Sequence, residues 1–223
     1  MKIGSLNSFL IIIAAILLIS CSENKQEVKK RVLPILGFHD TELTIEDGEE
    51  RIDTIFHKVS DFYFMGHNNS PVTNLTVNGK IYVADFFFTH CPTICPIMTK
   101  NLAEFHKNTA DIEELIIVSH TIDPERDSIT RLNEYIELLD LETRDDWFFV
   151  RGSQEYTYDI GKYQYLVNAD IDPAAEGGFL HSEHFVLVDR EGRIRGMYEG
   201  TDPQQVKQLE VDIRQLIAIE YGE

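Results

Sequence analysis

Two cysteines lie four residues apart in the segment 88–96, which reads FTHCPTICP. A buried-strand pattern precedes the segment and an amphipathic helical pattern follows it, so Cys91 and Cys95 fall at a predicted strand-to-helix junction. The N–H groups and dipole at the amino end of a helix stabilise thiolates and lower thiol pKa values. A spacing of four puts both side chains on one helical face, with Cβ atoms about 5–6 Å apart. The pair is suited to share a metal ion, or to close a disulfide after a small adjustment.

The alternative interpretation without a function is that both cysteines are buried and serve as small apolar side chains. That interpretation does not explain why each cysteine is followed by proline, or why Cys91 and Cys95 stand four apart at such a junction. The chain has only three cysteines, too few for a disulfide-stapled small fold. We therefore expect the pair to carry the chemistry.

The third cysteine, Cys21, ends a targeting pattern at the amino terminus. An apolar run at 9–19 is shorter than the roughly 20 residues that a spanning helix needs, and it fits the hydrophobic region of a signal peptide. The segment 18–21 resembles a bacterial lipobox, in which the cysteine is lipidated and becomes the first mature residue. We expect residues 1–20 to be a lipoprotein signal peptide and Cys21 a lipidation site. An uncleaved anchor is the alternative, and either arrangement exports the chain and tethers it to a membrane.

Hydrophobic periodicity predicts the elements that must position the cysteine pair. Continuous apolar runs predict buried strands at 81–88, 115–122 and 147–150, and a hairpin follows at 184–188 and 194–198. Helical patterns separate the first strands and end the chain, while 61–64 and 72–77 resemble an edge hairpin. The order predicts an α/β thioredoxin-like fold: a central mixed sheet flanked by helices, with an N-terminal extension and a C-terminal β-hairpin plus helix.

Composition divides the remaining chain and excludes one function class. We expect 21–31 to be the lipidated N-terminus and a flexible tether, 32–59 an N-terminal arm, and 60–223 the thioredoxin-like domain. The 38 acidic residues outnumber the 20 basic ones, which gives a formal charge of −18. A nucleic-acid binder needs a basic face to neutralise phosphates, so nucleic acid is excluded as a partner. With no basic patch for anionic headgroups, the lipid is the expected membrane attachment.

The FTHCPTICP segment resembles the Cys-Pro-x-x-Cys-Pro motif of the SCO/SenC family, which are copper-binding thioredoxin-fold proteins of cytochrome c oxidase assembly. The Thr-His before Cys91, the Asp-Pro-Glu-Arg-Asp run at 123–127 and the single-histidine hairpin before the last helix are also similar to the family pattern. The resemblance covers about residues 60–220. It implies copper as the metal and the copper-containing subunit of cytochrome c oxidase as the partner. The targeting pattern at the amino terminus predicts a location on the periplasmic or extracytoplasmic side of a bacterial membrane.

Two thiolates leave a soft metal in a monomer short of ligands, so one of the eight histidines should complete the site. By resemblance, the metal histidine of the family corresponds to His181. The glycines at 177–178 would allow a close backbone approach at this junction, which lies near the cysteine loop in a thioredoxin-like fold. His184 is the rival, although it could equally be a partly buried strand histidine. We expect His90 to shape the loop, because consecutive strand residues point to opposite faces.

A set of two thiolates and one imidazole suits Cu(I) and can also hold Cu(II). Zinc usually takes four ligands, but ligand types alone do not exclude it, so the choice of copper rests on the resemblance. Asp123 falls at the carboxyl end of the second buried strand, the edge where ligands bind in open α/β sheets. It could contact the ligands without binding the metal, and so orient His181 or tune the cysteine pair. It could instead cap the helix after Pro124.

The predicted function is a membrane-tethered copper chaperone that holds copper, as Cu(I), Cu(II) or both, on Cys91, Cys95 and His181. It would pass the metal to its partner by ligand exchange. The alternative is a thiol–disulfide oxidoreductase in which Cys91 attacks and Cys95 resolves, and its substrates could include the copper-site cysteines of the oxidase. The spacing is one residue longer than the Cys-x-x-Cys of thioredoxin-type enzymes, and no proline immediately precedes His184. A copper or redox sensor would use the same residues.

Overall fold

The computed structural model describes residues 32–46, 49–167, 169–171 and 179–222. The predicted lipobox, Cys21 and the glycines at 177–178 lie outside these residues, so the predictions made for them stay predictions. Within the described ranges, no helix combines the length and the apolar composition needed to cross a bilayer.

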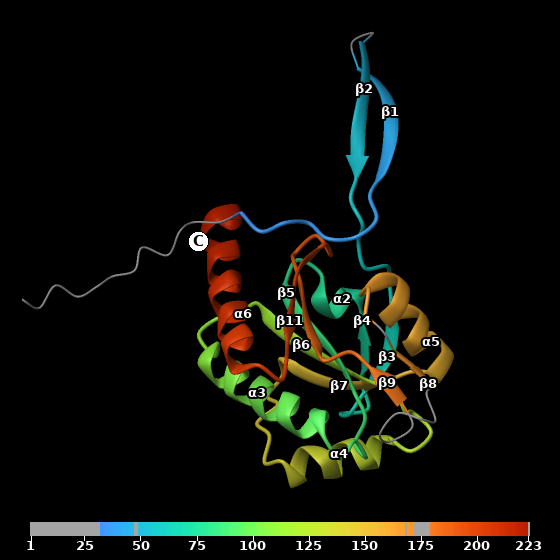
Figure 1. Cartoon of the computed structure of the whole chain (residues 1–223), viewed down its shortest axis with the longest axis vertical. Coiled ribbons are helices and arrows are strands. Elements are labelled where there is room, and N and C mark those ends of the chain that lie inside the picture. The colour runs from blue at the N-terminus through green and yellow to red at the C-terminus, as the bar shows by residue number, and fades with distance from the viewer. Residues whose placement is uncertain (1–31, 47–48, 168, 172–178, 223) are drawn as a thin grey trace, which may run out of the picture. The chain divides into compact units, whose positions relative to one another are not determined.

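A seven-stranded mixed sheet organises the chain, with the strand order β11-β10-β5-β6-β7-β3-β4 (Figure 1). Three parallel strands lie at its centre: β5 (Ile81–Phe87), β6 (Leu115–Thr121) and β7 (Trp147–Arg151). Every residue of β5 and β6 is buried, as the continuous apolar runs predict. The flanking strands are antiparallel: β10 (His184–Val188) and β11 (Ile194–Glu199) on one side, β3 (Tyr63–Gly66) and β4 (Pro71–Thr73) on the other.

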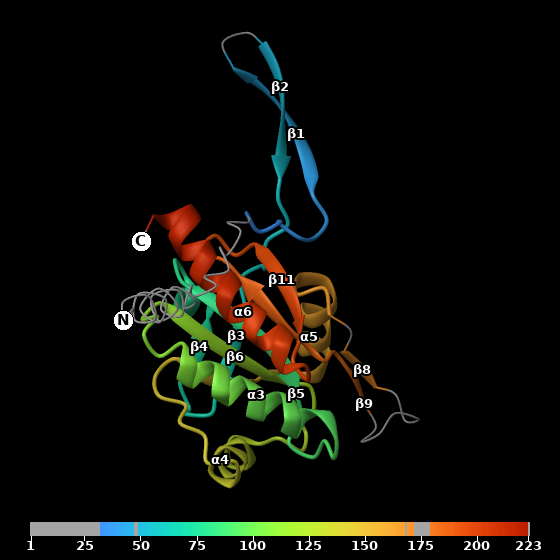
Figure 2. The ribbon, with the colours of Figure 1, turned by 60° about the vertical axis from the view of Figure 1, so that its left-hand side comes forward.

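Helices cover both faces of this sheet. Helices α3 (Ile94–Asn108), α4 (Ile129–Leu138) and α6 (Pro203–Leu216) lie on one face, and α5 (Gln154–Asp159) lies on the other (Figures 1 and 2). Short π-helices continue α5 at Ile160–Gln164 and α6 at Ile217–Tyr221. The chain passes from β5 through α3 to β6 and through α4 to β7, which are the crossovers expected of a parallel sheet. The predicted mixed sheet flanked by helices is confirmed.

The predicted edge hairpin differs from the structure at its second strand. Strand β4 stops at Thr73, and helix α2 (Asn74–Val77) follows in place of a continued strand. The Thr73 hydroxyl accepts the N–H of Leu75, and the Thr76 hydroxyl accepts the N–H of Thr73, so a capping box starts the helix. The threonines that favour a strand by propensity here serve as caps.

Two smaller hairpins stand apart from the main sheet. Strands β1 (Asp40–Glu46) and β2 (Glu49–Ile55) pair within the predicted N-terminal arm, and almost all of their side chains are exposed. Strands β8 (Ala169–Ile171) and β9 (Phe179–His181) form the second hairpin, ahead of β10 (Figure 2).

Candidate metal centre

Cys91 and Cys95 meet where β5 gives way to α3. Cys95 is the second residue of α3, and its N–H donates to the sulfur of Cys91 at 3.4 Å. Thr93 precedes the helix but makes no side-chain capping bond. The Cys91 sulfur therefore accepts an N–H of the first helical turn that would otherwise lack a partner. This position favours a thiolate on Cys91, as the spacing predicts.

Both cysteines are buried, with 7% of Cys91 and 1% of Cys95 exposed, and no disulfide joins the two. A hydrogen bond with Cys91 and then burial raise the pKa of Cys95 above its ordinary value. The expectation that the helix end lowers both thiol pKa values is therefore wrong for Cys95. Cys95 therefore keeps its proton in the metal-free protein. Two neighbouring buried sulfurs fit a soft ion such as Cu(I), and metal binding would release that proton.

A buried polar chain lies on the same face of the sheet as α3. The Ser119 hydroxyl donates to Asp85 at 2.5 Å, and the indole N–H of Trp147 donates to the Ser119 oxygen at 3.0 Å. Burial raises the pKa of Asp85 to about 7, although the bond from Ser119 opposes the shift. Asp85 interacts electrostatically with Cys95, so this carboxyl group is close enough to affect the pKa of that thiol. Asp85 stands inside an apolar run, where pattern alone predicts an apolar side chain, so it is not among the residues predicted from the sequence.

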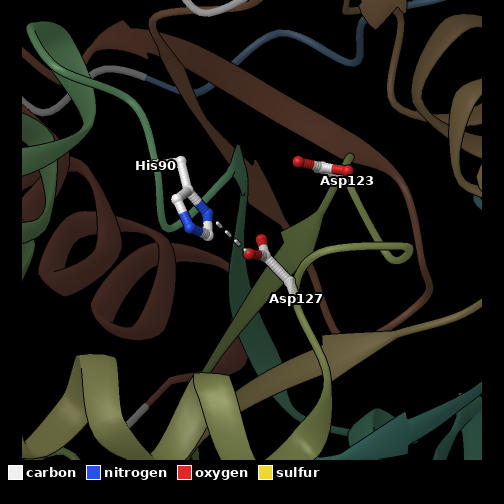
Figure 3. Close-up of side chains that lie close together, drawn as sticks. All are labelled: His90, Asp123 and Asp127. Atoms are coloured by element: carbon white, nitrogen blue, oxygen red, sulfur yellow. Dashed lines mark ion pairs between the residues drawn. The ribbon is translucent and has the colours of Figure 1, made fainter.

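Next to the cysteines, His90, Asp123 and Asp127 bring possible ligand atoms within 4.8 Å of one another. His90 and Asp127 point toward each other in Figure 3, with 3.8 Å between Nδ1 and Oδ1. Thr89 lies between them: its hydroxyl donates to Asp127 at 2.6 Å and is 3.1 Å from Nδ1 of His90. His90 belongs to the loop that bears the cysteines and contacts its neighbour Thr89, while its shaping role stays a prediction.

Asp123 lies at the carboxyl end of β6, but it does not cap α4. The N-cap of α4 is Ser128, whose hydroxyl accepts the N–H of Arg131 at 3.2 Å. The side chain of Asp123 is buried and pairs with Arg126. The cap interpretation of Asp123 is therefore wrong, because five residues of irregular chain separate it from the helix. Its predicted contact with His181 stays a prediction, since that side chain lies outside the described structure.

The histidine candidates lie in the connection that leads into β10. The backbone of His181 ends β9, opposite Ala169. His184 begins β10, is exposed, and has Nδ1 at 3.0 Å from the Ser182 hydroxyl. Because Val186 pairs antiparallel with Ala84, the amino end of β10 lies at the same edge of the sheet as the carboxyl end of β5. The connection therefore enters the sheet at the edge that carries the cysteines, which suits a third ligand from this segment.

Comparison with known sequences gives a consistent result. A sequence model described as SCO1/SenC matches residues 52–218. The SCO1 protein homolog of Bacillus subtilis (strain 168) is 26% identical over 171 residues, which cover 75% of this chain and 86% of the relative. A protein of Stutzerimonas stutzeri named for copper binding is 29% identical over 135 residues, which cover 58% of this chain and 63% of that protein.

Solved structures agree. A SCO1/SenC family lipoprotein from Bacillus anthracis str. Ames has a TM-score of 0.65 and 28% identity, covering 72% of this chain and 95% of that one. BsSco, described as a member of the Sco family of cytochrome c oxidase assembly proteins with a disulfide switch, has a TM-score of 0.65 and 26% identity, covering 73% of this chain and 95% of that one. These likenesses confirm the thioredoxin-like fold.

Proposed function

Because the chain belongs to the SCO1/SenC family, we propose that it binds copper and takes part in cytochrome c oxidase assembly, delivering the metal to the copper-containing subunit. The observation that carries the proposal is the buried pair at the amino end of α3, where the Cys91 sulfur already accepts a helix N–H. His181 supplies the third ligand. The name of the Stutzerimonas stutzeri relative and the assembly role printed for BsSco support the metal and the process.

Copper is the cargo in this proposal, and each step exchanges one ligand for another. Cys91 offers a thiolate, and Cys95 gives up its proton when it binds the ion. A thiolate of the partner then replaces one sulfur at a time, so the ion keeps at least two ligands throughout. Lipidation at Cys21 would hold the domain on the extracytoplasmic side of the membrane. The lipoprotein described from Bacillus anthracis supports that placement.

The test is a Cu(I) titration of the reduced full chain in detergent, with bicinchoninate as the competing chelator. Wild type should bind one ion, and Cys91→Ser/Cys95→Ser should bind none. His181→Ala should lose affinity about 10- to 100-fold, while the matched variant His184→Ala should stay within about twofold of wild type. Unchanged affinity in His181→Ala would refute the three-ligand site, and tight binding by the double serine variant would refute the cysteine centre.

Thiol–disulfide exchange is a second candidate, favoured by the contact between the two cysteines and by the disulfide switch described for BsSco. In this reaction the Cys91 thiolate attacks a disulfide, one partner sulfur leaves as a thiolate, and Cys95 then attacks the mixed disulfide. The partner is reduced, the pair is oxidised, and an external dithiol must restore it. Cys95→Ser should trap the mixed disulfide when the protein is incubated with a peptide whose cysteine is joined to glutathione by a disulfide. Fast trapping without any Cu(I) binding would replace the chaperone with the oxidoreductase.

A further inference from the structure

The carboxylate of Asp127 joins the ends of two central strands at the cysteine edge of the sheet. It accepts the Thr89 hydroxyl at 2.6 Å and the Thr89 N–H at 3.1 Å, just after β5. It also accepts the hydroxyl of Thr121, the last residue of β6, at 2.5 Å. Asp127 itself belongs to the connection between β6 and α4 and is completely buried. One side chain therefore fixes the exit of β5 against β6.

The exit fixed in this way is the segment that presents the first cysteine. Thr89 precedes Cys91 by two residues, and the carbonyl of Phe88 accepts the N–H of Cys91 at 3.2 Å. From α4, Nε of Arg131 donates to the Thr89 hydroxyl oxygen at 3.0 Å. The backbone before Cys91 is thus fixed from β6 and from α4. The position of the Cys91 sulfur depends on these contacts, although none of them touches the sulfur.

The same contacts assign the proton on the neighbouring histidine. The single hydroxyl proton of Thr89 is donated to Asp127, so Nδ1 of His90, at 3.1 Å from the Thr89 oxygen, must be the donor in that contact. His90 is therefore held with its proton on Nδ1, facing Asp127. Its side chain is 44% exposed, so part of the ring is in contact with solvent.

Asp123 provides an internal comparison for Asp127. Both carboxylates are buried, belong to one connection and lie near His90 (Figure 3). The carboxylate of Asp123 pairs with Arg126, whereas its backbone N–H donates to Thr121 at 3.1 Å. A cation at these three side chains would displace the hydroxyl donors of Asp127 and compete with Arg126. The hydrogen bonds therefore favour a holding role for Asp127 over an ion site.

We propose that Asp127 is a positioning residue for the cysteine pair: through Thr89 it holds the loop in the metal-free protein in the arrangement that copper requires. The proposal rests on the proposed function where copper affinity is concerned. The effect of Asp127 on the thiols is independent of copper, because the same loop sets the separation and the environment of the two sulfurs.

The test compares Asp127→Ala, Asp127→Asn and the control Asp212→Asn in the reduced full chain. Asp212 is a buried carboxylate of α6 that accepts the Tyr198 hydroxyl at 2.8 Å. The first readout is the equilibrium of the Cys91–Cys95 disulfide with dithiothreitol, without copper, and the second is Cu(I) affinity against bicinchoninate. We expect Asp127→Ala to change the disulfide equilibrium and weaken copper binding, each by about 10- to 100-fold, with Asp127→Asn in between. Asp212→Asn should stay within about twofold of wild type in both readouts.

Further variants keep the proposal testable if Asp127→Ala does not fold. Thr89→Val, which removes the hydroxyl bond, should move both readouts in the same direction, and Thr89→Ser should restore them. Unchanged readouts in Asp127→Asn and Thr89→Val would overturn the proposal. A second equivalent of metal that wild type binds and both Asp127 variants lose would replace it with an ion site. Should wild type bind no Cu(I), the proposed function fails, while the dithiothreitol readout still decides the role of Asp127.

Discussion

Two completely buried carboxylates lie at opposite edges of the sheet, and their partners differ. Asp127 lies at the carboxyl end of β6 and is held by the hydroxyls of Thr89 and Thr121 and by one backbone N–H. Asp189 follows β10, beside the amino end of β5, and accepts bonds from two guanidinium groups, those of Arg193 at 2.7 Å and Arg195 at 3.0 Å. One edge uses neutral donors, and the other uses full charges.

The difference follows from what each edge must do. Arg195 also donates to the carbonyls of Leu33 and Pro34 and to Glu220, so the cluster around Asp189 joins the start of the described chain to the π-helix that follows α6. Such a set of paired charges fastens distant segments. At the other edge, none of the hydrogen bonds described for Asp127 comes from a guanidinium group. The carboxylate is held by neutral donors, and the guanidinium of Arg131 contacts the cysteine loop through the Thr89 hydroxyl instead of through Asp127.

The largest effect should come from disrupting the charged cluster around Asp189. Arg195→Met removes the buried guanidinium and leaves Asp189 and Glu220 to the more exposed Arg193, which should cost about 3–5 kcal/mol in the free energy of unfolding. Urea denaturation measures this loss. Arg214→Met is the control, because Arg214 pairs with Asp111 in solvent, and its unfolding midpoint should hardly move. An Arg195→Met protein as stable as wild type would contradict the fastening role, as would a large loss of Cu(I) affinity in the folded variant.

A buried histidine tests the comparison further. His120 is completely buried among Phe64, Phe86 and Tyr165, and neither ring nitrogen has a hydrogen-bond partner among the residues that the structure describes. Burial lowers the pKa of His120 to about 3. Below the ordinary pKa of 6.5 the unfolded chain binds a proton that the folded chain refuses, so the free energy of unfolding falls as the pH falls from 6.5 toward 3.

His120→Phe should remove this acid sensitivity, because phenylalanine fills the aromatic cluster without a titrating group. At pH 4 the variant should be more stable than wild type by about 3 kcal/mol beyond any difference at pH 7.5. Urea midpoints at the two pH values give the comparison. Parallel pH profiles for wild type and variant would show that His120 is not the source of the acid sensitivity.

Asp85 should produce a smaller effect of opposite sign. Its pKa is raised to about 7, so the folded chain holds a proton that the unfolded chain releases above pH 3.8. The free energy of unfolding should therefore fall as the pH rises from about 4 to 7. In Asp85→Asn this fall should shrink by about 2 kcal/mol between pH 5 and pH 7, since the amide still accepts from Ser119. A pH dependence as steep as that of wild type would show that Asp85 titrates normally.

The sequence predicts those parts of the fold that depend on local pattern. The apolar runs identify β5, β6 and β7, and the spacing of four identifies the cysteine junction. The Asp127 network is different, because it joins residues 38 positions apart and leaves no periodic signal. Asp127 and Thr89 stand in two motifs that the sequence singles out, but motif membership does not reveal the bond between them. Asp85 and His120 interrupt buried strands, where pattern alone predicts apolar side chains.

The hydrogen bond accepted by the Cys91 sulfur provides a way to observe the state of the site. Because it accepts the N–H of Cys95, that amide belongs both to the backbone of α3 and to the thiol chemistry. Deuterium uptake at this one amide should follow the state of the sulfur: slow while the sulfur accepts the bond, and faster once the sulfur is alkylated or drawn away. The chain thus carries a backbone reporter of its own thiol state, which amide NMR can follow without any label attached to the cysteines.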